Sequence, residues 1–317
     1  MDHEALAREL VRVMRGKRSQ PWLSRRLGLR SNLVYRWEAG RAFPTAMQFF
    51  RICRLTKTQG SLDFERFLGG EWRLDLETQQ GVGGLLKRLA GAAPVSEIAK
   101  ELGQSRFVVS RWLTGKTQIR LPELLGFIQA TTRRLLDFLS VYLDPGLLAS
   151  AAREWKRLQA ARQAAYEVPW SHGVLRALEL RDYAQVTGDS EAWVGARLGL
   201  PRAEVVRALA LLRQSGQVKR YRGRFRVVRS ELVDTGVDQQ RRQTLRSFWT
   251  RVALEQLDQG AQGIHAFNLF TIAENDIPQI RAWHTELFER IRGLISKSSP
   301  AERVMLYSAQ ILTLDQS

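Results

Sequence analysis

The sequence is poor in the residues that form covalent or metal cross-links. Of its 317 residues, one is a cysteine, Cys53, and four are histidines. A single cysteine cannot form an intramolecular disulfide, and these residues do not have the spacing of a zinc site. We therefore expect neither a disulfide scaffold nor a zinc-dependent fold, and Cys53 is expected to be a buried apolar residue.

Long apolar runs and a secretory leader are also missing. No apolar run approaches the roughly 18 residues that a membrane-spanning helix needs. The longest run, around residues 135–143, is interrupted by Asp137. The first residues lack the charged-then-apolar order of a signal peptide. Together with the scarcity of cysteine, these absences predict a cytoplasmic protein.

Intact catalytic motifs are scarce as well. The segment from Ser110 to Thr117 approaches a phosphate-binding P-loop. However, Ser110 replaces the first glycine, and the segment follows a predicted helix where a P-loop follows a strand. No acidic cluster has metal-binding spacing. We therefore expect no enzymatic activity and no cofactor.

What the sequence has in excess is positive charge. Its 49 lysines and arginines against 32 acidic residues give a net charge of +17, which favours a polyanionic partner. Residues 1–145 carry 24 basic and 14 acidic residues, residues 146–235 carry 16 and 9, and residues 236–317 carry 9 and 9. The expected anion-binding surfaces therefore lie before residue 236, and the last quarter of the chain has another role.

An internal repeat with an offset of 75 residues occupies the first half of the chain. Seven positions match within eighteen residues, and six of them are identical, including a glycine–tryptophan pattern. The matched pairs are Leu23 and Ile98, Leu27 and Leu102, Gly28 and Gly103, Val34 and Val109, Arg36 and Arg111, Trp37 and Trp112, and Gly40 and Gly115.

Each copy predicts a short helix, a glycine turn and a second helix. In the first copy, Gly28 suits the left-handed end of a helix, and Ser31 is the expected cap of the next one. Val34 and Trp37 fall on the inward face of that second helix. In the second copy, Ser105 is the expected cap.

Residues 20–44, with the pattern Q-x-x-L-x-x-x-L-G-L-x-S-x-x-V-x-R-W-E-x-G-x-x-x-P, resemble the Cro/repressor (XRE) helix-turn-helix family. Residues 95–117 resemble a degenerate version, in which Leu113 stands where the first copy has Glu38. The resemblance implies a recognition helix that enters the major groove of DNA. Whether the second copy contacts DNA or is a structural spacer stays open, because residues 61–82 beside it are acidic.

A third pattern follows a helix predicted at residues 151–166. Helices are expected near Leu175, at residues 193–198 and from Pro201 to Gly216, followed by strands at 218–221 and 225–228. This order resembles a winged helix-turn-helix domain. Its hairpin region, residues 217–229, holds six basic residues and no acidic one, so it either lies along DNA phosphates or remains in water.

The last quarter predicts a small α+β domain. Helices are expected at residues 245–257 and 278–295, and strands at 263–272 and 304–314. This segment is similar to a little-characterised group of bacterial helix-turn-helix proteins. We expect it to form a homodimer, sense a small molecule or bind another protein.

The candidate DNA-binding residues come from the outward faces of these motifs. Phe107 is expected either to touch a thymine methyl group or to pack against another domain, and Arg202, Arg207 and Arg213 lie on the second helix of the winged pattern. The full candidate set is Arg30, Ser31, Asn32, Tyr35, Arg36, Arg41, Arg106, Phe107, Ser110, Arg111, Lys116, Lys219, Arg220, Arg222 and Arg224.

These observations predict a mainly helical bacterial protein, associated with the nucleoid, that regulates transcription by binding double-stranded DNA at specific sequences. The alternative is an architectural or RNA-binding protein that uses the same basic surfaces without recognising base sequence. The predicted domains are two helix-turn-helix units at 1–60 and 61–145, a connecting helix at 146–170, a winged-helix domain at 171–235 and the α+β domain at 236–317.

Overall fold

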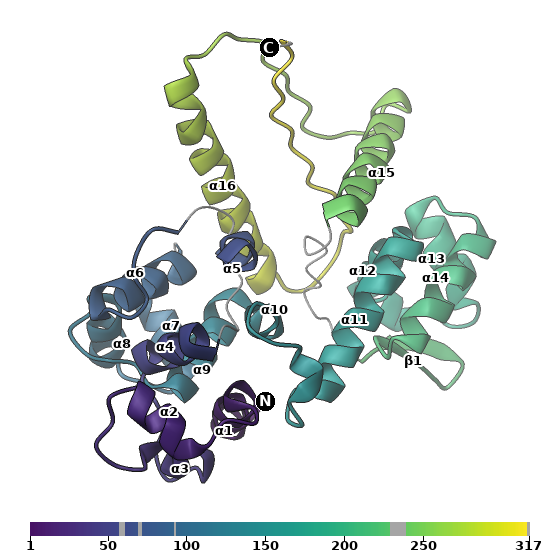
Figure 1. Cartoon of the computed structure of the whole chain (residues 1–317). Helices are drawn as coiled ribbons and strands as arrows, with labels where there is room; N and C mark the ends of the chain where they lie inside the picture. The colour runs from purple at the N-terminus through teal and green to yellow at the C-terminus, as the bar shows by residue number, and fades with distance from the viewer. Residues whose placement is uncertain (57–60, 69–71, 92, 229–238, 316–317) are drawn as a thin grey trace. The chain divides into compact units, whose positions relative to one another are not determined.

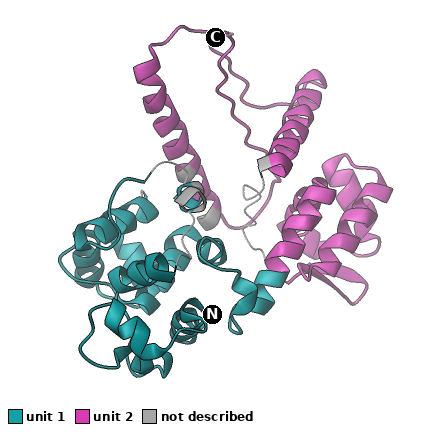
Figure 2. Ribbon diagram, viewed as in Figure 1, with its two compact units in different colours: residues 1–156 teal, residues 157–317 magenta. Residues whose placement is uncertain are grey.

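The computed structural model describes residues 1–56, 61–68, 72–91, 93–228 and 239–315 (Figure 1). The described chain is mainly helical, as the sequence predicts, and its one sheet has two strands. The chain divides into two compact units, residues 1–156 and 157–317 (Figure 2). The boundary between them falls inside a helix, α11 (Ala152–Glu167).

Unit 1 is built from two sets of five helices. Each helix of the first set has a counterpart about 75 residues later, so the duplication extends well beyond the eighteen residues that reveal it in the sequence. The first set is α1 (His3–Arg15), α2 (Gln20–Arg26), α3 (Leu33–Glu38), α4 (Ala46–Thr56) and α5 (Ser61–Leu68). The second set is α6 (Gln79–Ala90), α7 (Val95–Leu102), α8 (Arg106–Leu113), α9 (Leu121–Thr132) and α10 (Leu135–Ser140), and a 3-10 turn, η1 (Pro145–Leu147), follows it.

Local sequence sets where the short helices begin and end. Gly28 and Gly103 follow α2 and α7 with φ of +72° and +63°, a backbone region that glycine enters without steric cost. The expected cap of α8 is confirmed, since Ser105 accepts a hydrogen bond from the Val108 N–H. At α3 the cap is Asn32, whose side chain accepts from the Tyr35 N–H, so the prediction of Ser31 was one residue early.

The inward faces of α3 and α8 are buried as predicted. Val34 and Trp37 are almost fully buried, and so are Val109 and Trp112. All four belong to one continuous hydrophobic cluster that draws side chains from both sets of helices. The two repeats therefore share a single core, and Cys53 lies buried within it.

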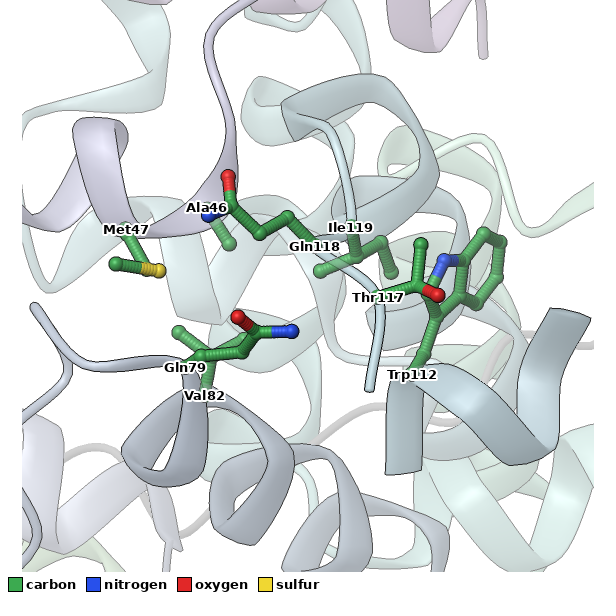
Figure 3. A pocket seen from close by; sticks show the side chains of 8 residues that line it. All are labelled: Ala46, Met47, Gln79, Val82, Trp112, Thr117, Gln118 and Ile119. Carbon is green, nitrogen blue, oxygen red and sulfur yellow. The ribbon is translucent and has the colours of Figure 1, made fainter. Parts of the chain in front are cut away.

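The two repeats also join through backbone hydrogen bonds. Thr45 and Arg120 form an isolated antiparallel bridge just before α4 and α9. Beside this junction lies a small cavity between the starts of α4 and α6 and the segment that follows α8 (Figure 3). Its lining has no charged side chain; it consists of Ala46, Met47, Gln79, Val82, Trp112, Thr117, Gln118 and Ile119.

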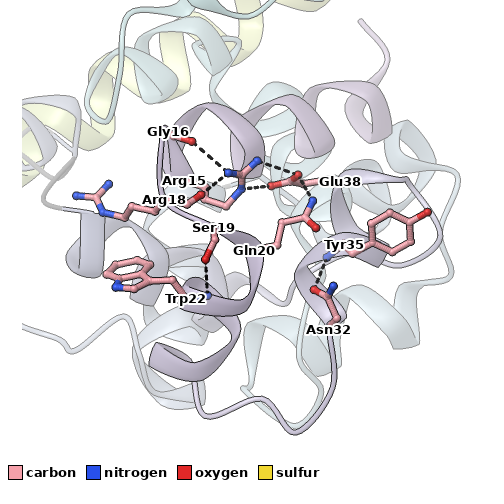
Figure 4. A network of polar contacts seen from close by, with 9 residues as sticks. All are labelled: Arg15, Gly16, Arg18, Ser19, Gln20, Trp22, Asn32, Tyr35 and Glu38. Atoms are coloured by element: carbon pink, nitrogen blue, oxygen red, sulfur yellow. Dashed lines mark hydrogen bonds and ion pairs between the residues drawn. The ribbon is translucent and has the colours of Figure 1, made fainter.

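One polar network distinguishes the first repeat from the second (Figure 4). Arg15 donates from Nε to Glu38 Oε1 at 2.6 Å, and Gln20 Nε2 donates to Glu38 Oε2 at 2.6 Å. The equivalent positions in the second repeat hold Ala90, Leu113 and Val95, all packed against the core. The replacement of Glu38 by Leu113 is therefore one part of a matched exchange of three polar side chains for three apolar ones.

Unit 2 begins with a second, smaller core. It is formed by α12 (Trp170–Ala177), a 3-10 helix η2 (Arg181–Gln185), α13 (Ser190–Leu198) and α14 (Arg202–Gln214). The hairpin of β1 (Val218–Tyr221) and β2 (Arg224–Val227) closes this core with Val218 and Phe225. Gly199 separates α13 from α14 with φ of +68°, at the turn that the sequence predicts.

The remainder of unit 2 consists of α15 (Gln239–Asp258), η3 (Glu274–Asp276), α16 (Ile277–Lys297) and extended segments. Trp170 contacts the rings of Phe248 and Trp249, which holds α15 against α12. The helices expected after residue 244 are present. The strands expected at 263–272 and 304–314 are not formed among the described residues, where these segments have no regular secondary structure and the sheet consists of β1 and β2.

Two of the predicted domain boundaries, at residues 60 and 235, lie outside the described residues. The boundaries at 145 and 170 stay predictions. The C-terminal domain was expected to be α+β, but its described part contains helices and extended chain only.

The polar network predicts a specific pattern of stabilities. Glu38→Leu removes the carboxylate that Arg15 and Gln20 share and leaves a half-buried guanidinium unpaired. We expect the free energy of unfolding to fall by about 2 kcal/mol, less than for a fully buried pair because Arg15 also donates to two backbone carbonyls.

The matched control is the triple variant Arg15→Ala, Gln20→Val, Glu38→Leu, which copies the second repeat. Its free energy of unfolding should return to within about 1 kcal/mol of the original, since an apolar replacement of a whole network is close to neutral. Urea titrations followed by tryptophan fluorescence measure both values. A triple variant less stable than Glu38→Leu would contradict this account of the exchange.

Candidate nucleic-acid interface

The first candidate surface is the outward side of α3 and its two flanks, here called the α3 surface. Burial of Val34 and Trp37 fixes the rotation of α3, so the side chains between them face solvent. All six predicted members are exposed and adjoin one another along this segment: Arg30, Ser31, Asn32, Tyr35, Arg36 and Arg41.

The α3 surface is electrostatically positive. Its arginines are exposed, and the Arg41 guanidinium lies 5.9 Å from the centre of the Tyr35 ring. The single carboxylate of α3, Glu38, is only 10% exposed and paired with Arg15. The negative charge of this helix is therefore neutralised on the inner side, and the outer side presents only cations and neutral hydrogen-bonding groups.

A neighbouring pair of cations was missed in the sequence. Arg18 and Arg26 lie 5.2 Å and 5.9 Å from the centre of the Trp22 ring on α2. Trp22 and Arg26 are four residues apart on α2, and this i, i+4 spacing was the available signal for Arg26. They extend the positive surface of the first repeat to α2.

The second candidate surface, here called the α8 surface, occupies the equivalent place in the second repeat. Its members Arg106, Phe107, Ser110, Arg111 and Lys116 are all exposed, and Phe107 is 76% exposed, so it does not pack within unit 1. Arg111 donates from Nε to Thr117 Oγ1 at 2.8 Å, which orients its guanidinium.

The two surfaces share some positions and differ at others. Arg36 and Arg111 are equivalent, as are Arg41 and Lys116. Asn32, however, has Phe107 as its counterpart. The adjacent helix also differs, since α7 carries exposed Glu97 and Glu101 where α2 carries Trp22 and Arg26. The second repeat therefore presents a weaker positive field than the first.

The third candidate surface is the hairpin of unit 2, whose turn has two residues. Arg222 and Gly223 both adopt positive φ, +48° and +81°. The register places Lys219 directly opposite Arg226, and Tyr221 opposite Arg224. Two cations that face each other across a pair of strands repel each other and destabilise the pair. A bound anion would reduce the repulsion between Lys219 and Arg226.

Arg226 belongs to this cluster although it was not among the predicted residues. Its guanidinium lies 4.7 Å from the centre of the Tyr221 ring, and that of Arg222 lies 5.4 Å from the same ring. Strand alternation was the available signal, since a residue directly opposite Lys219 shares its face. Lys219, Arg222 and Arg226 form the exposed cationic cluster, here called the hairpin cluster.

Arg224 has a different place. It is half-buried, and its Nη1 donates to the carbonyls of Ala184 and Val186 at 3.0 and 2.7 Å. Beside it the Tyr183 hydroxyl donates to the Phe225 carbonyl at 2.9 Å, and burial raises the pKa of Tyr183. Arg224 therefore fastens the hairpin to η2. Arg220 is exposed and lies directly opposite Phe225, with its guanidinium 5.7 Å from the centre of that ring.

On α14, Arg207 and Arg213 are exposed, whereas Arg202 is paired with Asp189. Asp189 caps α13. The Ala192 N–H donates to its carboxylate, and this bond together with Arg202 holds the pKa of Asp189 below its usual value. Arg202 is thus engaged at the turn between the two helices, and the other two arginines extend into solvent.

Other kinds of site find no support in the described residues. They contain no group of three or more histidine, cysteine or acidic side chains placed to hold a metal ion. None of their helices combines the length and apolar character needed to span a bilayer. The P-loop-like segment is the end of α8 and the turn that follows, so the described backbone there is helical where a P-loop would need a strand before it.

Comparison with known proteins identifies one family. A family model described as a domain of unknown function, DUF4423, matches residues 149–314, more than half of the chain, so the chain belongs to this family. No helix-turn-helix or XRE family was identified among the family models. No curated protein and no solved structure matches significantly.

The geometry of the hairpin predicts different effects for two neighbouring arginines. Arg224→Ala removes two hydrogen bonds to backbone carbonyls, and we expect the free energy of unfolding of unit 2 to fall by about 1–3 kcal/mol. Arg226→Ala removes the same charge but relieves the repulsion with Lys219, so stability should stay level or rise at low salt.

Thermal unfolding of the two variants at low and high salt measures this difference. The Arg224→Ala loss should persist at high salt because hydrogen bonds are not screened, whereas any gain in Arg226→Ala should vanish there. Equal behaviour of the two variants would contradict the separate places assigned to them.

Proposed function

We propose that this member of the DUF4423 family is a sequence-specific, double-stranded-DNA-binding transcriptional regulator. The observation that carries the proposal is the α3 surface. A buried Val34–Trp37 face holds the helix in place, its one carboxylate is neutralised internally, and its exposed side is formed by arginines with Asn32 and Tyr35. Function within the bacterial cytoplasm, at the nucleoid, is part of the proposal.

The proposal assigns α2, the Gly28 turn and α3 to a helix-turn-helix, in line with the resemblance of residues 20–44 to the Cro/repressor family. A helix of this kind fits the major groove, where arginine pairs with guanine and asparagine with adenine. Arg36 and Asn32 are the base-contacting candidates. Arg30, Ser31, Tyr35 and Arg41 are candidates for phosphate contacts.

The same proposal treats α12, α13, α14 and the hairpin as a winged helix-turn-helix. The hairpin cluster supports phosphate binding, because a polyanion relieves the repulsion between Lys219 and Arg226. Such contacts make affinity depend steeply on salt concentration and carry no sequence information. Unit 2 would then add affinity, and unit 1 would add specificity.

The alternative is an architectural or RNA-binding protein that uses the same cations without base recognition. Selection of genomic fragments with the purified full chain, repeated over a salt series, separates the two. A shared short motif that survives excess random duplex supports the regulator. Uniform, salt-labile binding without a motif would overturn it in favour of the alternative. A DNA-processing enzyme is the weakest candidate, and the same preparation incubated with Mg²⁺ and duplex should leave the DNA intact.

We assign the C-terminal part to homodimer formation. Sixteen large apolar side chains between Ile264 and Leu314 are exposed. At about 200 Å² for each fully exposed side chain, their exposed fractions add up to a surface on the order of 2,000 Å². This total exceeds the roughly 800 Å² that each partner buries in a stable complex.

A second copy is the partner that charge favours. Residues 236–317 carry nine basic and nine acidic residues, so two such segments meet without net repulsion although the whole chain carries +17. Sensing of a small molecule or binding of another protein by this region remains a further candidate role. The dimer would present two copies of the DNA-binding units to the genome.

A test of base recognition uses Arg36. Arg36→Ala should weaken binding to the selected motif by about 1–3 kcal/mol, roughly 5- to 150-fold, and relax the preferred sequence at one base step, because a bidentate contact to guanine is lost. Fluorescence anisotropy with the selected motif and with single-base variants measures both effects.

The matched control is Arg54→Ala, which makes the same change in net charge within unit 1. Arg54 lies on α4 and pairs with Glu77, which precedes α6, so it is not a member of the α3 surface. Its removal should lower affinity for all duplexes slightly and equally. Identical losses in the two variants, with unchanged sequence preference, would mean that α3 does not recognise bases.

A test of the dimer uses two fully accessible side chains. Phe267→Asp together with Leu312→Asp adds charge at positions 97% and 70% exposed, so the single chain should fold unchanged. We expect light scattering to report a dimer for the original chain and a monomer for this variant. Phe107→Asp, an exposed aromatic position in unit 1, is the control and should remain dimeric; a monomeric original chain would contradict the assignment.

A further inference from the structure

The repeats of unit 1 are joined by two backbone hydrogen bonds. The Ala46 N–H donates to the Ile119 carbonyl, and the Leu121 N–H donates to the Pro44 carbonyl, both at 2.8 Å. With the offset of 75 residues, Ala46 is equivalent to Leu121, and Pro44 to Ile119. Each repeat therefore donates from the same position and accepts at the same position.

The bridge between these bonds pairs Thr45 with Arg120. Arg120 is also the residue of the second repeat that is equivalent to Thr45. Reciprocal contacts, in which residue i of one copy meets residue j of the other and the converse holds, are the mark of a two-fold axis. Copies related by a simple translation along a tandem array do not make them. A pseudo-two-fold axis thus passes through the Thr45–Arg120 bridge.

The packing of the helices agrees with this axis. α1 packs against α9, and α6, the equivalent of α1, packs against α4, the equivalent of α9. α4 also contacts α9, and α5 contacts α10, so each of these helices meets its own counterpart. Exchange of the two repeats leaves this set of contacts unchanged.

We propose that unit 1 binds, within a single chain, an imperfect inverted repeat in one DNA duplex, with α3 on one half-site and α8 on the other. This inference rests on the proposed function. A two-fold axis presents α3 and α8 in opposite directions, which matches the opposite polarity of the two DNA strands. Tandem units related by translation would instead require a direct repeat.

The side chains predict which positions of the two half-sites agree. Arg36 and Arg111 are equivalent, and arginine prefers guanine. We therefore expect the same base, preferably guanine, at the corresponding position of each half-site. Asn32 and Phe107 are equivalent but differ in chemistry. An adenine is expected opposite Asn32 and a thymine methyl opposite Phe107, which makes the repeat imperfect.

The shared core also fixes the distance between the half-sites. One continuous hydrophobic cluster joins the repeats, so neither can move independently of the other. Two inserted base pairs turn one half-site by about 70° and shift it by about 7 Å. We expect an insertion or deletion of two base pairs between the halves to lower affinity at least tenfold.

The experiment compares the motifs selected by three full-length proteins: the original chain, Arg36→Ala and Arg111→Ala. The original chain should select an imperfect inverted repeat. Arg36→Ala should relax the preference in one half only, and Arg111→Ala should relax the mirrored position in the other half only. A merely structural role for either arginine would weaken all sequences and would not move one position of the motif.

Three outcomes overturn the inference while the regulator stands. The first is a motif that is a direct repeat. The second is a single half-site, with an affinity that does not change when base pairs are inserted beside it. The third is a perfect palindrome that Arg111→Ala leaves unchanged, which would mean that two chains each use α3. Binding without any shared motif would overturn the proposed function and, with it, the inference.

Discussion

The common core of the two repeats is the constraint on which unit 1 depends. Each five-helix set is short, and its apolar faces are buried both within the set and against the other set, where α1 packs on α9 and α6 on α4. Burial of Trp37 and Trp112 in that core sets the rotation of α3 and α8. The exposure of Arg36 and Arg111 follows from it, so the candidate interface is a consequence of the core rather than a separate feature.

Duplication within one chain allows the two copies to diverge while the core is kept. The first repeat holds α3 with the Arg15–Glu38–Gln20 network, and the second holds α8 with apolar side chains at the same positions. Both solutions satisfy the groups that they bury. The outward residues diverge further, because solvent imposes little constraint on them, and a site with unequal halves is the expected result.

The two units place positive charge for different purposes. On the α3 surface, positive charge is combined with neutral side chains that are proposed to distinguish bases. In the hairpin cluster, Lys219 and Arg226 face each other and repel. The neutral C-terminal part carries its exposed apolar side chains outside both. Base recognition, phosphate attraction and self-association are thereby proposed for separate segments, and each can be altered by substitution without disturbing the others.

The sequence by itself determined the local structure: the helices of the repeat, the glycine turns at Gly28 and Gly103, the hairpin, and the outward position of Phe107. These features depend on residues within one or two turns of one another. Only the tertiary structure decided that Glu38 is neutralised by Arg15, that Arg224 fastens the hairpin while Arg226 faces solvent, and that the repeats are related by a two-fold axis. Local patterns cannot specify these outcomes, since each is set by contacts between segments distant in the chain. The unformed strands at 263–272 and 304–314 show the same limit, because alternation predicts a strand but only a paired neighbour can form one.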